Sequence, residues 1–172
     1  MADNSANTQT ANDSSVEIQQ FEPQSVLFIK DTIQVANLST AMGDWIPTLL
    51  NYVQVRGAQP AGSIYVRYHT FGETETDMEI GIPVVEPVEG EGRIVRGELP
   101  GGSAIATWHL GPHDEGLRDA YTRMGAWQKE HGREPNGASW EVYYWIDPTH
   151  ENNPATQDDP STWRTQSVQP IK

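Results

Sequence analysis

Apolar residues recur along this 172-residue chain with two spacings, one typical of helices and the other of strands. Helical spacing first appears over residues 38–55, at Met42, Trp45, Ile46, Leu49, Leu50 and Val53. Gly57 can end this helix in a left-handed conformation, whereas Pro47 predicts either a kink or a helix that starts there. A second helix is expected to start after an N-cap at Asp114 and to end at Gly132. Its core-facing stripe comprises Leu117, Ala120, Tyr121, Met124 and Trp127.

The remaining apolar runs are short, rich in β-branched and aromatic residues, and bounded by turn residues, which predicts strands. They cover residues 25–30, 63–69, 78–85, 93–99, 104–110, 140–146 and 165–171. Because the order strand, helix, strand, strand occurs twice, we predict an α+β fold of tandem duplicated βαββ units. These units would form an antiparallel sheet with two helices on one face and a central ligand cleft. Aligning residues 62–68 with 138–144 makes Tyr65 the counterpart of Glu141.

The first 21 residues differ from the rest of the chain, being rich in Asn, Ser, Thr and Gln and lacking apolar periodicity. We therefore expect residues 1–21 to form a disordered tail and residues 22–172 to form one ligand-binding domain. The tail has no pair of amphipathic helices with which to build a helix-turn-helix.

The formal net charge is −13, from 24 acidic and 11 basic residues. This excess of acidic residues argues against direct nucleic-acid binding and favours the attraction of cations. Alternatively, the negative charge only keeps the protein soluble. The absence of cysteine excludes disulfides, thiolate metal sites and cysteine nucleophiles. With no signal peptide and no apolar stretch long enough to span a membrane, we expect a cytoplasmic protein without membrane association.

Glu141 is the main candidate for chemistry because it lies mid-strand among aromatic residues. Strand alternation places Glu141, Tyr143 and Trp145 on one face. It places the more apolar set Trp140, Val142 and Tyr144 on the other, which we expect to pack against the helices. A carboxylate among aromatic rings can hold an organic cation or, when buried, act as a general acid or base. Alternatively, Glu141 lies on an open sheet face and contacts only water.

Other aromatic and histidine residues are secondary candidates. Tyr65, Tyr68, Trp108 and Tyr143 are suited either to line a ligand pocket or to pack in the core. His109 and His113 are spaced as in zinc-binding helices, but the intervening Gly111-Pro112 breaks a helix, and the chain has no H-E-x-x-H motif. We therefore expect no metal and no cofactor.

Four segments of the chain resemble motifs of the gyrase-inhibitor-like family and occur in the same order as in that family. The family also supplies effector-binding domains to bacterial multidrug transcription regulators. Residues 77–84 are similar to its D-x-E-x-G-x-P-V strand, and residues 109–113 to its H-x-G-P-Y helix start. Residues 140–143 resemble its glutamate-bearing strand, and residues 163–171 its final strand. His113 departs from the family pattern by replacing the usual tyrosine.

The resemblance implies a tandem βαββ fold and a pocket for lipophilic, often cationic compounds, with the strand glutamate as a key polar contact. The residues that we expect to bind the ligand are Glu141, Tyr143, Tyr65, Tyr68, Trp108, Trp145 and His113. The resemblance also implies that some free-standing members of the family hydrolyse strained electrophilic toxins with a glutamate and a tyrosine. In this chain Glu141 and Tyr143 are the candidates for these two roles. Other members protect DNA gyrase.

Three hypotheses follow for the function. The first is a free-standing domain that sequesters or senses a lipophilic small molecule, either cationic or neutral, through Glu141. The second is a hydrolase in which Glu141, helped by Tyr143, activates water against an electrophilic ring. The third is a protein that modulates gyrase or binds another partner; we rank it last because the acidic residues are scattered along the chain.

Overall fold

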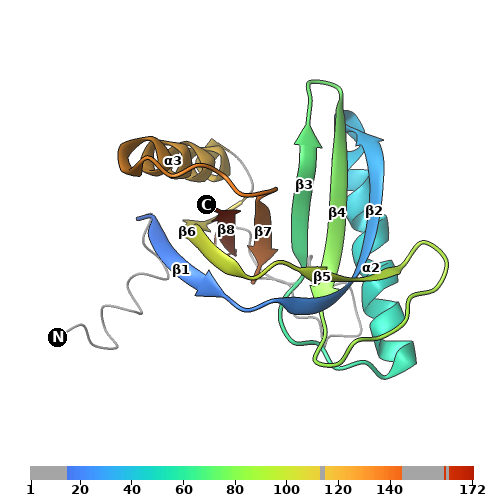
Figure 1. Ribbon diagram of the computed structural model, residues 1–172. Helices are drawn as coiled ribbons and strands as arrows, with labels where there is room; N and C mark the ends of the chain where they lie inside the picture. Colours follow the sequence, from blue (N-terminus) through green and yellow to red (C-terminus); the bar gives the residue numbers. More distant parts are fainter. Residues whose placement is uncertain (1–14, 113–114, 145–160, 162) are drawn as a thin grey trace.

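The computed structural model describes residues 15–112, 115–144, 161 and 163–172 (Figure 1). Its elements are β1 Glu17–Phe21, β2 Gln24–Gln34, the 3-10 turn η1 Val35–Asn37, α2 Leu38–Arg56, β3 Tyr65–Phe71, β4 Glu75–Pro83, β5 Val95–Leu99, β6 Gly102–Leu110, α3 Glu115–His131, β7 Trp140–Tyr143 and β8 Arg164–Pro170. Both helices and all seven strands expected from the sequence are present, and β1 is additional.

The eight strands form one antiparallel sheet in the order β1-β6-β8-β7-β3-β4-β2-β5. This order reads as two copies of the same arrangement meeting where β7 pairs with β3. One copy is β2-α2-β3-β4 and the other is β6-α3-β7-β8, which confirms the tandem βαββ fold. The strands β1 and β5, which precede the two units, are exchanged: β1 pairs with β6 and β5 pairs with β2.

Helix α2 runs from Leu38 to Arg56 with Pro47 inside it, so the alternative that it starts at Pro47 was wrong. A proline in this position leaves the carbonyl one turn back, that of Gly43, without its usual donor. Gly43 is exposed, so water can satisfy this group. Burial of the apolar side chains of the helix outweighs the remaining free-energy cost of Pro47. The buried residues are Trp45, Ile46, Leu49, Leu50 and Val53.

Both helices end at a glycine in the left-handed conformation, as the sequence predicts. Gly57 closes α2 with φ 66°, and Gly132 follows α3 with φ 63°. After each of them a proline forms an isolated bridge to the end of its unit, Pro60 to Val84 and Pro135 to Ile171. These matched positions show that the segment from the end of each helix into the following strand corresponds residue by residue in the two units.

This correspondence corrects the alignment made from sequence by one residue. With Pro60 matched to Pro135, the counterpart of Glu141 is Val66, and Tyr65 corresponds to Trp140. The predicted pairing of Tyr65 with Glu141 was therefore wrong. Because side chains alternate along a strand, this single-residue shift moves Tyr65 to the opposite face of the sheet from Glu141.

Strand β1 lies within the region that we expected to be a disordered tail. Residues 17–21 pair with β6, from Glu17 opposite Ala106 to Phe21 opposite Gly102. The prediction was wrong for these residues because β1 is an edge strand, ordered mainly by backbone hydrogen bonds rather than by a buried apolar face. Ile18 is half exposed, so the strand carries only a weak hydrophobic signal.

Candidate functional site

Glu141 and Tyr143 lie on the face of β7 that carries the helices, not on the opposite face as we expected. Tyr143 belongs to the core cluster of α2, and the hydroxyl of Tyr121, on α3, donates to Glu141. Trp140 and Val142 point the other way. The prediction failed because both faces of β7 are covered: the chain between β1 and β2 and the β5–β6 ribbon cross in front of the central strands (Figure 1). Apolar alternation therefore could not identify the helix side.

Glu141 is buried, with 3% of its surface exposed, and both of its oxygens accept hydrogen bonds from tyrosines. The Tyr121 hydroxyl donates to Oε2 at 2.6 Å, and the Tyr143 hydroxyl donates to Oε1 at 3.0 Å. Tyr68 lies next in this group, in hydrogen-bonding contact with Tyr143 and close enough to sense the charge of Glu141. One carboxylate thus lies among three tyrosines drawn from β3, α3 and β7.

The electrostatics of this group favour neutral forms. Burial raises the pKa of Glu141, while its hydrogen bonds from Tyr121 and Tyr143 and the nearby charge of His109 partly oppose the rise. Burial, reinforced by the negative charge of Glu141, raises the pKa of Tyr68, Tyr121 and Tyr143. The tyrosines therefore remain hydrogen-bond donors, and Glu141 is the group that changes charge.

None of the salt bridges among the described residues involves Glu141. Across the sheet, Glu141 lies opposite Ser167 of β8, which in turn lies opposite Thr107 of β6. The equivalent row in the first unit is apolar, Val66 beside Ile80 and Ile29. Polarity on the helix side is therefore concentrated in the second unit, around Glu141.

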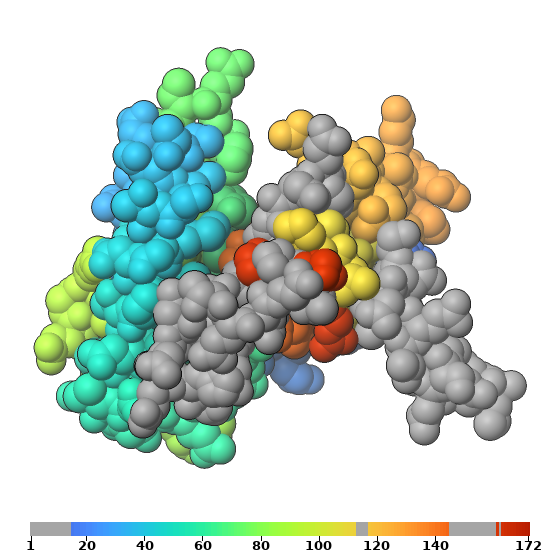
Figure 2. Space-filling view, turned by 180° about the vertical axis from the view of Figure 1, so that it is seen from behind, coloured from blue at the N-terminus to red at the C-terminus, as the bar shows by residue number. Residues whose placement is uncertain are grey.

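The helix side is hollowed between the two units. In Figure 2, α2 and the residues of α3 with the end of β6 stand on either side of this hollow. Glu141 occupies the strand between them, because β7 pairs with β3 at the junction of the units. Glu141 therefore lies on the sheet between the two helices.

The residues expected to bind the ligand divide into three sets. Glu141, Tyr143 and Tyr68 come together on the helix side. Tyr65 and Trp108 do not join them: Tyr65 lies in the cluster of the opposite face, and Trp108 packs on Tyr144 with ring centroids 5.3 Å apart. Trp145, His113 and the expected N-cap Asp114 lie outside the described residues.

Two residues of the group were not proposed as ligand contacts from sequence. Tyr121 was assigned to the core stripe of α3, and its spacing is indeed that of a core position; only its hydroxyl distinguishes it from a packing residue. His109 was considered only for zinc, whereas it lies near Glu141 and its Nε2 lies 2.7 Å from the carbonyl oxygen of Pro112. The available signal was the family resemblance: His109 lies in residues 109–113, which resemble the family's helix start, and Tyr121 follows them in the same helix.

A second buried carboxylate lies on the opposite face. Glu79, 5% exposed, accepts a hydrogen bond from the Tyr65 hydroxyl through Oε2, and its Oε1 lies 2.7 Å from His69 Nε2. Burial and the charge of Glu79 raise the pKa of Tyr65. Glu79 thus has an imidazole partner, unlike Glu141, whose direct contacts here are tyrosine hydroxyls.

A family model described as the GyrI-like small molecule binding domain matches residues 14–159. The chain belongs to this family. Its match begins before β1 and includes both helices and the strand that carries Glu141. The chain is thus a small-molecule-binding domain, and the resemblance read from its four motifs is confirmed. No curated protein sequence matches the chain.

Solved structures share the fold of this GyrI-like domain. The EcmrR C-terminal domain has a TM-score of 0.75 at 20% identity, over 92% of this chain and 97% of that one. In an EcmrR–DNA complex the TM-score is 0.77 at 20% identity over 92% of this chain, which spans only 57% of the EcmrR chain. A hydrolase encoded by lin2189 from Listeria innocua has a TM-score of 0.63 at 11% identity, over 98% and 97% of the two chains. SAV2435 bound to tetraphenylphosphonium has a TM-score of 0.57 at 11% identity, over 92% and 94%.

Within the part of the chain that the structure describes, no group of three or more histidine or acidic side chains could hold a metal ion. Within the same residues, neither helix combines the length and apolar character of a membrane span.

The raised pKa of Glu141 predicts how stability depends on pH. The folded state keeps the Glu141 proton at pH values where the unfolded chain, with an ordinary pKa near 4.5, has lost it. This contribution to the free energy of unfolding is complete below pH 4.5 and is lost as the pH rises through the folded-state pKa. Urea denaturation between pH 4 and 8 should show the loss in the wild type relative to Glu141→Gln, and a difference independent of pH would contradict it.

Proposed function

We propose that this domain binds a lipophilic, positively charged small molecule between α2 and α3, with Glu141 as its counter-ion. The observation that carries the proposal is the buried carboxylate of Glu141, which takes part in no salt bridge among the described residues. Burying a charge that has no salt-bridge partner is costly, so the pKa of Glu141 is raised even though the charge of His109 partly opposes the rise. A cationic ligand in direct contact with the carboxylate would favour its charged form.

The surroundings of Glu141 suit an organic cation better than a hydrated metal ion. Tyr68 and Tyr121 are only partly buried, and a ring that contacts the ligand can add cation–π attraction of about 0.5–2 kcal/mol. Beyond Tyr68 and Tyr143, the same face continues into the apolar core that includes Val66 and Met78. A ligand with one delocalised positive charge and aromatic substituents matches this combination.

The structural neighbours support the same chemistry. SAV2435, whose fold this chain shares, is bound to tetraphenylphosphonium, a lipophilic cation. EcmrR carries the same fold at its C-terminus and binds DNA as a longer chain. We propose that the present chain senses or sequesters its compound through the same type of domain.

The proposal is tested by isothermal titration calorimetry with tetraphenylphosphonium and the neutral, similarly shaped triphenylphosphine oxide. We expect one cation per chain and a clear preference for the cation at pH 8. Equal affinity for the two compounds, or binding of neither, would overturn the proposal.

Hydrolysis is a second candidate, favoured by the two hydroxyl donors within 3.0 Å of a carboxylate with a raised pKa. In this reaction Glu141 would take a proton from water, whose oxygen attacks a carbon of a strained ring such as an epoxide. A tyrosine would give its proton to the ring oxygen as the carbon–oxygen bond breaks, and the proton taken up by Glu141 would then return to that tyrosine through their hydrogen bond. Incubation with styrene oxide distinguishes the candidates: a diol formed over many turnovers and lost in Glu141→Gln supports the hydrolase.

A further inference from the structure

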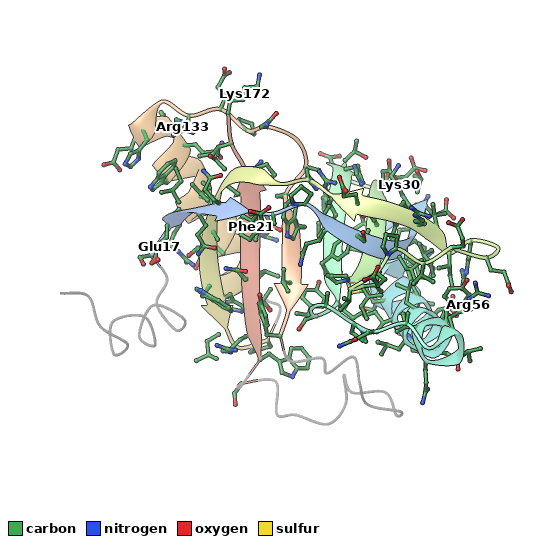
Figure 3. All side chains as sticks on the ribbon, turned by 60° about the horizontal axis from the view of Figure 1, so that its bottom comes forward. Glu17, Phe21, Lys30, Arg56, Arg133 and Lys172 are labelled. Carbon is green, nitrogen blue, oxygen red and sulfur yellow. The ribbon has the colours of Figure 1, made fainter. Side chains whose placement is uncertain are left out.

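A cavity of about 400 Å³ opens on the face of the sheet opposite Glu141. Its walls come from the end of β1, the loop before β3, the turn between β5 and β6, and the central strands β7 and β8. Figure 3 shows Phe21, one of its lining residues, where β1 ends in front of the central strands. The volume falls in the range of small-molecule pockets, and every lining residue belongs to the described part of the chain.

Aromatic side chains form much of this cavity. Phe21 meets Trp140 edge to face, with ring centroids 6.2 Å apart, and Tyr65 and Tyr144 complete the aromatic set. Tyr65 and Trp140 are buried parts of the core, so their rings hold fixed positions. Rigid ring faces and edges of this kind favour a planar aromatic ligand, because stacked and edge-to-face contacts add to area burial.

Three of the polar side chains that line the cavity are amides. Gln20, Gln24 and Gln166 contribute side chains, and the only charged residue in the lining is the exposed Glu22. Gln166 is 6% exposed, and its one side-chain hydrogen bond among the described residues is a long one, 3.5 Å, from the Tyr144 hydroxyl to Oε1. Its Nε2 therefore offers a nearly buried donor to a ligand.

We propose that this cavity is a second binding site, which takes an uncharged, planar heteroaromatic molecule bearing both a hydrogen-bond donor and an acceptor. An amide such as Gln166 pairs with either group and provides no net charge, whereas Glu141 on the other face provides a negative one. The two sites are separate because β7 alternates: Trp140 and Val142 face this cavity, and Glu141 and Tyr143 face the helices. Binding in this cavity therefore does not require a ligand at Glu141.

Three bicyclic probes of similar shape test the charge preference: neutral quinolin-2-one, cationic N-methylquinolinium and anionic naphthalene-2-carboxylate. Binding is followed by nuclear magnetic resonance through the indole NH of Trp140 and the side-chain amide of Gln166. We expect quinolin-2-one to shift both signals and to bind at least tenfold more tightly there than either ion. Equal shifts from all three probes, or none at millimolar concentration, would overturn the proposal.

Two variants locate the binding. Gln166→Leu removes the amide while keeping a side chain of similar size, and we expect quinolin-2-one to bind about tenfold more weakly. This loss corresponds to about 1.4 kcal/mol, which is within the usual range for one buried hydrogen bond. Ser63→Phe, in the loop at the cavity wall, should block the cavity without altering the sheet. Glu141→Gln is the control and should leave quinolin-2-one binding unchanged. A loss in Glu141→Gln with no effect of Ser63→Phe would place the probe on the helix side and refute a second site.

Discussion

Glu141→Gln is expected to weaken tetraphenylphosphonium binding by about 30-fold at pH 8 and to change triphenylphosphine oxide binding by no more than about twofold. Removing one charge of a buried pair typically costs 2 kcal/mol or more, and 2 kcal/mol is about a 30-fold change in dissociation constant. Glutamine keeps the shape of the side chain and an acceptor for Tyr121 or Tyr143, so the neutral compound should find nearly the same site. Calorimetry on both proteins with both compounds gives the four constants needed.

The pH dependence of the same titration separates charge from shape. Because burial raises the pKa of Glu141, part of the wild-type protein carries a neutral side chain at acidic pH and must release a proton to bind a cation. Cation affinity should therefore rise with pH, by up to tenfold per unit below the folded-state pKa, and then level off. In Glu141→Gln the affinity should stay flat over the same range.

Glu79→Gln provides a matched control, since Glu79 is also a buried glutamate with a tyrosine hydroxyl as donor. It lies on the opposite face of the sheet and contacts His69 instead of the group around Glu141. We expect it to leave tetraphenylphosphonium binding unchanged once its own melting temperature is taken into account. Equal losses in the two variants would show that binding depends on overall acidity or stability, not on the Glu141 charge.

The sequence was most informative where local chemistry decides the structure. Glycines with positive φ end both helices, Gly57 and Gly132, and the apolar stripes predicted both helices near their observed lengths. The candidate Glu141 could also be found, because a charged residue inside an aromatic strand conflicts with simple core packing. These signals depend on neighbours a few residues away, which a sequence displays directly.

The side of the sheet on which Glu141 lies could not be found in this way. The strand β7 is covered on one face by the helix layer and on the other by residues such as Phe21 and Leu99. A strand buried on both faces loses the alternation that reports orientation, and Trp140 proved a better partner for Phe21 than for a helix. The residues that cover β7 on the face away from the helices come from β1 and β5. These strands are exchanged between the two units, and such long-range pairing cannot be read from neighbouring residues in the sequence.

Strand β1 and Tyr121 illustrate two further limits. Because β1 is an edge strand with a half-exposed Ile18, its order comes from backbone pairing that any sequence can provide. Tyr121 serves both packing and hydrogen bonding, so its helical spacing identified only the first role. Its contact with Glu141 joins α3 to β7 and depends on how the helix packs against the sheet.

The glycine of the D-x-E-x-G-x-P-V motif explains another part of the fold. Gly81 lies directly opposite Tyr65 in the register of β3 and β4, and the tyrosine ring covers it. A Cβ at position 81 would lie 2.5 Å from the Tyr65 hydroxyl oxygen and 2.6 Å from the ring. The motif's glutamate, Glu79, accepts the hydrogen bond of the same hydroxyl. Gly81 and Glu79 together therefore hold one buried tyrosine flat against the sheet.

Gly81→Ala is accordingly expected to lower the free energy of unfolding by about 1–3 kcal/mol, the usual cost of an added methyl group in a packed core. Tyr65 is 1% exposed and held by Glu79, so its ring cannot move aside without losing that hydrogen bond. Gly125→Ala is the control: this helical position of α3 has nothing within 4 Å of the added carbon and should gain about 0.5–1 kcal/mol. Urea denaturation of both variants measures the difference. Equal stability changes would show that Tyr65 does not confine position 81, and that the motif glycine has another cause.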